Sequence, residues 1–167
     1  MRLLIEGWRG VHHSFAMVNQ FQILSLLKRP GLRLFHRDLP MPLGWTPAAQ
    51  GAGLSAEDAA RIAALGEPAA GEVVGAVYRI CSPFRAGAPG DARRTITFMV
   101  TELGLGANSF AADADRGFFT RDGNLVVTPS PWSRDRLAEA GLDPARIQVV
   151  PHGVDAAAFR PLDPAQR

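Results

Sequence analysis

The side chains with the clearest capacity for chemistry lie in the segment Gly7–Ser14, which joins an apolar run to a stretch with helical spacing. It carries the guanidinium group of Arg9 and the imidazole rings of His12 and His13. Between a strand and a helix, backbone amides and the positive end of the helix dipole converge on a ligand. The three side chains could therefore bind a polyol or a phosphate. The alternative is that they form an ordinary polar loop.

A second candidate is Glu102, which directly follows the most apolar segment of the chain, residues 95–101. If that segment is a parallel strand, Glu102 emerges at the carboxyl edge of the sheet, where α/β proteins bind their ligands. Its carboxylate could accept hydrogen bonds from sugar hydroxyls or orient a general base. The alternative is a glutamate that caps the following segment.

Two kinds of site are not indicated by this pattern. The adjacent His12 and His13 point to different sides of the backbone, and no carboxylate or cysteine stands four residues further on, so we predict no metal site. The glycines Gly7 and Gly10 do not fit the G-x-G-x-x-G fingerprint of a dinucleotide site. A Rossmann-like enzyme that binds a nucleotide at this loop is therefore the least favoured hypothesis.

The apolar pattern of residues 2–37 predicts a strand–helix–strand unit that positions the loop. We expect a strand over Arg2–Gly7, a helix over Ser14–Leu27 with Ser14 as its N-cap, and a parallel strand over Leu32–Arg37. His36 falls at the end of this second strand, where a ligand-binding role and a buried structural role are equally expected. The predicted apolar face of the helix consists of Phe15, Val18, Phe21, Leu24 and Leu27.

The alternation continues along the chain. Strands are expected over residues 73–80, 95–101, 124–128 and 147–150, and helices over residues 55–65 and 132–140. Ser55 and Ser130 are the predicted N-caps, and Trp132 is expected in the core. This cadence predicts the α/β class, with a Rossmann-like, doubly wound, mostly parallel sheet and helices on both faces.

One stretch of the sequence carries a family resemblance. Val126–Ser133 is followed by Gly141-Leu142, Ile147 and Val149–Asp155, with Phe159 and Pro161 beyond. This order resembles the end of the N-terminal domain of group 1 (family 4) retaining glycosyltransferases. The opening also looks like that family's acceptor-side loop, through His13-Ser14-Phe15 and Asn19-Gln20. The chain departs from the family at His152, where asparagine is common, and at Glu102, which takes the place of a histidine.

The resemblance implies one half of a GT-B architecture, in which two Rossmann-like domains face each other across a cleft. Residues 1–155 would form the N-terminal, acceptor-side domain, and residues 156–167 would be the interdomain linker. In the family, the C-terminal domain holds the nucleotide-sugar donor through an E-x7-E motif. That domain is not part of this sequence, so we expect the chain alone to be inactive as a hexosyltransferase.

The resemblance also implies a set of site residues and ligands. The donor is a substrate, so no cofactor is expected, and the expected partners are a sugar, glycan or lipid acceptor and a donor-binding domain in a longer chain. The predicted catalytic residues are Glu102 and His13. The predicted substrate-binding residues are Arg9, Gly10, His12, Ser14, Arg37, His152 and Gly153.

Composition limits the remaining possibilities. The 167 residues include 18 basic and 16 acidic side chains, and this net charge of +2 does not favour nucleic acid as a partner. The lone Cys81 and the lack of a signal-peptide pattern at the start of the chain predict a cytoplasmic location. Apolar residues left open by a missing domain predict weak self-association. The alternative to the enzyme hypothesis is a non-catalytic carbohydrate-binding or partner-dependent module.

Overall fold

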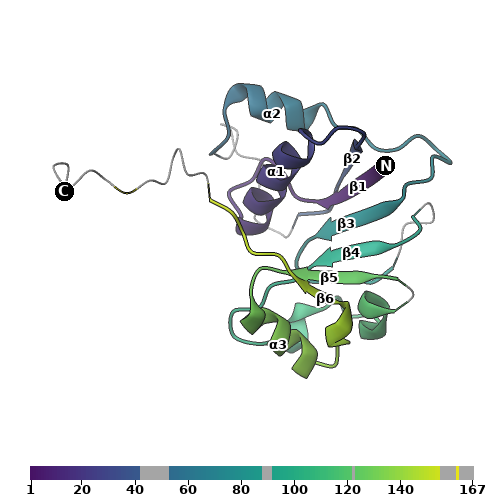
Figure 1. Ribbon diagram of the computed structural model, residues 1–167, viewed down its shortest axis with the longest axis vertical. Helices are drawn as coiled ribbons and strands as arrows, with labels where there is room; N and C mark the ends of the chain where they lie inside the picture. The colour runs from purple at the N-terminus through teal and green to yellow at the C-terminus, as the bar shows by residue number, and fades with distance from the viewer. Residues whose placement is uncertain (42–52, 88–91, 122, 155–160, 162–167) are drawn as a thin grey trace.

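The computed structural model describes residues 1–41, 53–87, 92–121, 123–154 and 161. Its centre is a six-stranded sheet with the order β2-β1-β3-β4-β5-β6, in which each strand pairs in parallel with its neighbours (Figure 1). The strands are β1 (Arg2–Gly7), β2 (Arg33–Asp38), β3 (Ala76–Ile80), β4 (Thr95–Phe98), β5 (Leu125–Thr128) and β6 (Ile147–Val149).

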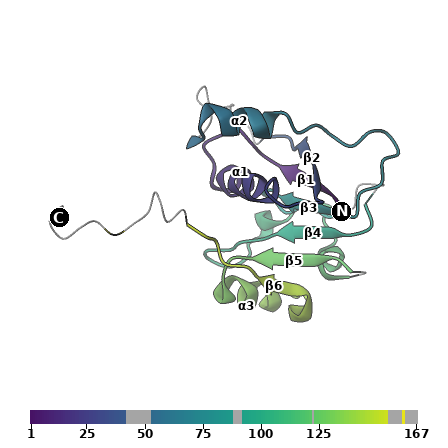
Figure 2. The ribbon, with the colours of Figure 1, turned by 45° about the horizontal axis from the view of Figure 1, so that its top comes forward.

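Helices cover both faces of this sheet. The first face holds α1 (Ser14–Leu26) and α2 (Ala56–Ala63), which pack on β1 through a cluster that includes Leu3, Ile5 and Ile23. The second face holds α3 (Pro131–Glu139) and the 3-10 helix η3 (Arg116–Thr120), and Figure 2 shows α3 at the opposite end of the view from α1 and α2. The predicted α/β, Rossmann-like, doubly wound fold is confirmed. Two shorter 3-10 helices are η2 (Ala107–Ser109) and η4 (Pro144–Arg146).

The strand order identifies the place where a ligand is expected. The chain passes from β1 to β2 on one side and then crosses back past β1 to β3 on the other, so the direction of winding reverses between β1 and β3. In open α/β sheets, the crevice outside the carboxyl ends of the strands at such a switch point is the usual binding site. The loop that follows β1, residues 8–13, lies at that point.

Helix α1 differs from its prediction in two respects. Its N-cap is His13, whose backbone is extended and whose Nδ1 accepts the Phe15 N–H, so the expectation that Ser14 is the N-cap is wrong. The predicted apolar face is also rotated, because Phe21 is 51% exposed. The buried residues of α1 are Ala16, Asn19, Gln20, Ile23 and Leu24. The helix turns two amides inward, and the loop before it uses both.

The other elements agree with the sequence except at their ends. The side chains of Ser55 and Ser130 accept N–H bonds in the first turns of α2 and α3, so both predicted N-caps are confirmed. The strands predicted over 73–80 and 95–101 are shorter, since β3 begins at Ala76 and β4 ends at Phe98. Trp132 is 47% exposed on α3, so its predicted place in the core is wrong. Apart from Pro161, the predicted linker 156–167 lies outside the described residues.

Candidate functional site

A row of aromatic rings runs along the carboxyl edge of the sheet on the face that α1 covers. His13 meets Phe15 with ring centroids 5.6 Å apart, and Phe15 meets Phe98 at the end of β4 at 5.8 Å. His152, which follows β6, stacks on Phe98 at 5.6 Å with an interplanar angle of 17°. The row therefore connects the loop after β1 with the segment after β6, and two of the predicted site residues, His13 and His152, stand at its ends with Phe15 and Phe98 between them.

The imidazole of His13 is held firmly in this row. Its Nδ1 accepts the Phe15 N–H at 3.1 Å, and its ring packs at a near-right angle against the buried Trp8 indole, with ring centroids 4.9 Å apart. Burial lowers the pKa of His13 below its ordinary value of 6.5. At neutral pH the ring is therefore uncharged, and because Nδ1 is an acceptor the proton resides on Nε2.

The loop before α1 is fixed by the two inward amides of the helix. Asn19 is fully buried and donates to the Trp8 carbonyl at 2.9 Å. Gln20 accepts the Gly10 N–H at 2.7 Å, where Gly10 has a φ of +71°. These two hydrogen bonds hold the backbone of the loop in place, and the Gly10 N–H is already bonded within the protein.

Arg9 connects the same loop to β2 and α2. Its guanidinium pairs with Asp38 at 2.9 Å and donates to the carbonyls of Ile62 and Leu65 at 2.7 and 3.2 Å. A cavity of about 280 Å³ lies beside it, between the loop, α1 and α2, and both Arg9 and Gly10 line this cavity. The geometry gives Arg9 a structural task, and its contact with a substrate stays a prediction.

His36 has the buried structural role that was one of its two expected roles. Its ring is inaccessible, its Nε2 lies 3.2 Å from the Asn19 Nδ2, and its Nδ1 lies 3.6 Å from an Asp38 carboxylate oxygen. Burial lowers the pKa of His36 to about 4, and the charge of Arg9 adds to this effect against the opposing charges of Asp38 and Glu67. In the neutral ring Nε2 accepts a hydrogen bond from the Asn19 amide, and Nδ1 carries the proton and faces the Asp38 carboxylate at 3.6 Å, beyond hydrogen-bond distance.

Arg37 lies on the other face of the sheet. Successive side chains of a strand alternate between faces, so Arg37 points away from His36 and α1. It donates to the buried Glu6 at 3.0 Å and to Glu67 at 2.7 Å, and Arg79 pairs with the same Glu6 carboxylate at 2.7 Å. The structure therefore does not place Arg37 in the aromatic row with His13.

The remaining predicted residues are exposed. Glu102 lies at the bend after β4, at the same edge of the sheet as the row of rings. His12 and Ser14 lie beside His13 at the start of α1, and Gly153 follows His152. These positions are accessible to a ligand, and the roles of all four residues stay predictions.

The sequence contained an unused signal for the support of this loop. Asn19 and Gln20 occupy the positions between Ala16 and Ile23 that a helix turns toward the core, and polar side chains are rarely placed there without partners. Phe98 carried no such signal, because a phenylalanine at the end of a buried strand is ordinary. Its place between Phe15 and His152 depends on the pairing of strands far apart in the sequence.

Among the described residues, none of the helices has the length and apolar character needed to cross a membrane. In the same part of the chain, no group of three or more histidine, cysteine, aspartate or glutamate side chains is placed to hold a metal ion.

Comparison with known proteins gives one match. Residues 84–158, slightly less than half of the chain, match the family model described as Glycosyltransferase Family 4. No curated protein and no solved structure matches the chain. The matched segment begins after β3 and includes β4, β5, α3, β6 and His152. The match supports a glycosyltransferase family 4-like domain in this chain, and hence a transferase by resemblance.

Proposed function

We propose that this chain is the acceptor-side, N-terminal domain of a retaining glycosyltransferase with GT-B architecture. In this proposal the donor is a nucleotide-sugar that delivers a hexosyl group, and the acceptor is a sugar, a glycan or a lipid. The donor is bound mainly by a second domain, which belongs to a longer chain, and the reaction takes place in the cytoplasm without a cofactor. The match of residues 84–158 to the glycosyltransferase family supports the class of reaction.

The observation that carries the proposal is the row of rings from His13 to His152. The row links a loop after the first strand with a segment after the last strand, at the edge of the sheet where α/β proteins bind their ligands. Here Phe15 and Phe98 join them, with spacings of 5.6 to 5.8 Å between successive ring centroids. Phe98 is buried inside the row, so the rings that a sugar can reach are His13 and Phe15, which are partly exposed, and His152, which is exposed.

The chemistry proposed for each residue follows from its protonation and its position at the edge of the sheet. The neutral His13 carries its proton on Nε2, which is a donor suited to a hydroxyl oxygen of the acceptor or of the transferred sugar. Glu102 supplies a carboxylate at the same edge, suited to accept hydrogen bonds from sugar hydroxyls. His12, Ser14 and Gly153 complete the acceptor surface.

The mass of the native protein tests this proposal. We would capture the protein from its own cells with an antibody against this region and measure its intact mass. A second Rossmann-like domain about as large as this one predicts a mass about twice 17.9 kDa. A native mass of 17.9 kDa would instead favour a carbohydrate-binding or partner-dependent module.

A further inference from the structure

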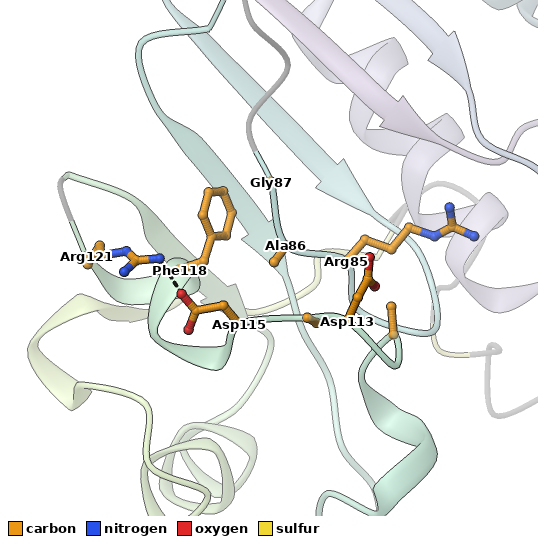
Figure 3. A pocket seen from close by; sticks show the side chains of 9 residues that line it. Arg85, Ala86, Gly87, Asp113, Asp115, Phe118 and Arg121 are labelled. Carbon is orange, nitrogen blue, oxygen red and sulfur yellow. Dashed lines mark hydrogen bonds and ion pairs between the residues drawn. The ribbon is translucent and has the colours of Figure 1, made fainter.

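A second cavity, of about 640 Å³, lies on the sheet face opposite α1 and α2 (Figure 3). It is open to solvent and is bordered by two segments that follow different strands. Residues 85–87 come after β3, and residues 111–121 lie between η2 and β5. The row of rings at His13 lies on the other face, so the two places are separate. The lining residues are Arg85, Ala86, Gly87, Ala111, Asp113, Ala114, Asp115, Phe118 and Arg121.

One wall of this cavity is held by a buried ion pair. Arg79 is 6% exposed and pairs with Glu6, which is 3% exposed, at 2.7 Å. The Nη1 of Arg79 also donates to the carbonyls of Arg85 and Gly87, both at 2.8 Å. A charged pair out of contact with water is costly unless its remaining hydrogen bonds are made, and these two carbonyls accept them. The wall formed by residues 85–87 is therefore shaped before any ligand arrives.

The opposite wall is anchored just as firmly. In η3, Phe119 is fully buried in the core, while the neighbouring Phe118 is partly exposed and lines the cavity. Asp115 caps η3 by accepting the Gly117 N–H at 2.9 Å and pairs with Arg121. Figure 3 shows the Phe118 ring beside this pair, with Ala86 and Gly87 across from it. An aromatic face, carboxylates and a guanidinium thus border one preformed hollow.

The combination of groups indicates the class of ligand. Two arginines and two aspartates line the cavity, so their formal charges cancel and an anion such as phosphate gains little there. A neutral sugar suits this lining: its hydroxyls donate to the Asp113 and Asp115 carboxylates and its C–H face packs on Phe118, while Arg121 keeps its ion pair with Asp115. The alanine and glycine side of the cavity leaves room for a ring.

We propose that this cavity binds a neutral pyranose unit, as a glycan-binding site separate from the edge where His13 lies. This proposal does not depend on sugar transfer, because binding alone tests it. In a glycosyltransferase, such a site would hold a distant unit of a long glycan.

The test is whether methyl α-D-glucopyranoside binds to the whole chain. Saturation-transfer NMR and amide chemical shifts detect this binding. We expect saturation transfer to the sugar ring and shifts at the amides of residues 85–87 and 113–118. Phe118→Leu keeps the apolar contact and removes the ring face, and it should weaken binding about tenfold. The matched control is Phe21→Leu, at an exposed ring on the other face, and it should bind as the unchanged chain does.

A second pair of variants tests the polar side of the cavity. Asp113→Asn keeps the shape and removes the charge, and we expect it to weaken glucoside binding, while Asp135→Asn on the surface of α3 should not. Amide spectra of each variant report whether the fold is kept.

Four results would overturn the inference. The first three are no glucoside binding at tens of millimolar sugar, equal binding by the Phe118→Leu and Phe21→Leu variants, and a preference of this cavity for inorganic phosphate. The fourth is glucoside shifts confined to His13, Phe98 and His152, which would leave the proposed transferase site intact.

Discussion

At the scale of single residues, His13 has two tasks that substitution can separate. It caps α1 through Nδ1, and we propose that its ring binds the substrate. His13→Asn keeps a capping side chain and loses the ring, whereas His13→Ala loses both. We expect both variants to lower kcat/KM for sugar transfer at least tenfold in the native-length protein.

Stability should distinguish the two variants. Loss of an N-cap costs about 1 kcal/mol, so urea unfolding should show that cost for His13→Ala and little of it for His13→Asn. If transfer by His13→Asn equals that of the wild-type protein, the imidazole has no part in the reaction and its role is the cap.

The buried His36 predicts a pH dependence of stability. Its pKa is about 4 in the folded protein, whereas the ordinary value in the unfolded chain is 6.5. Between these two values the unfolded chain binds the additional proton, so the free energy of unfolding falls as the pH falls from 6.5 to 4, by about 3 kcal/mol from this group. Arg9, Asp38 and Glu67 are the charged groups that act on it.

Denaturant unfolding at a series of pH values measures this effect. His36→Gln retains an oxygen that can accept the Asn19 amide and does not titrate, so its stability should change less across this window. His12→Gln, at an exposed histidine, is the control and should follow the wild-type curve. Equal slopes for His36→Gln and the wild-type protein would contradict the assignment.

At the scale of elements, β1 and β3 meet so closely at the switch point that only glycine fits there. A Cβ on Gly7 would lie 2.7 Å from Ile80 Cγ2 and 2.9 Å from the Ile80 carbonyl oxygen. Gly7→Ala should therefore cost about 1–3 kcal/mol of stability. The matched control is Gly66→Ala, where the added methyl meets open space, and its urea midpoint should change little. A neutral Gly7→Ala would show that the two strands can separate there at low cost.

The elements were largely predictable from local signals. Ser55 and Ser130 mark helix starts because a side-chain oxygen there bonds the first turn, and both serines do so. The errors arise where tertiary contacts decide. Phe21 fits an apolar stripe yet is exposed, because Asn19 and Gln20 are turned inward to bond Trp8 and Gly10. Spacing along a helix cannot show which loop needs an amide.

At the scale of the molecule, the sequence predicted the sheet but not the way its edge is assembled. The alternation of elements was sufficient for a parallel α/β fold. The link from His13 through Phe15 and Phe98 to His152 required the strand order, which local patterns do not determine. Arg37 was predicted to bind substrate; strand alternation places it on the face of the sheet opposite His36, where it donates to Glu6, and a role in binding stays a prediction.

The exposed apolar side chains predict how the molecule behaves at high concentration. Leu103 is 99% exposed, Trp132 47%, Val150 53% and Val154 77%, and all four lie in segments that follow β4, β5 or β6. We expect weak, concentration-dependent self-association in sedimentation equilibrium, reduced by Leu103→Ser with Val154→Ser. A strict monomer at high concentration would contradict this expectation.

The central claim is that this domain takes part in sugar transfer, and transfer itself tests it most directly. The native-length protein, purified from its own cells, would be incubated with radiolabelled nucleotide-sugars and with glycan and lipid extracts from those cells. The account predicts a labelled product that depends on one donor and is strongly reduced by His13→Asn and Glu102→Gln. No product above the heat-inactivated control with any donor, from a protein that is folded, would contradict it.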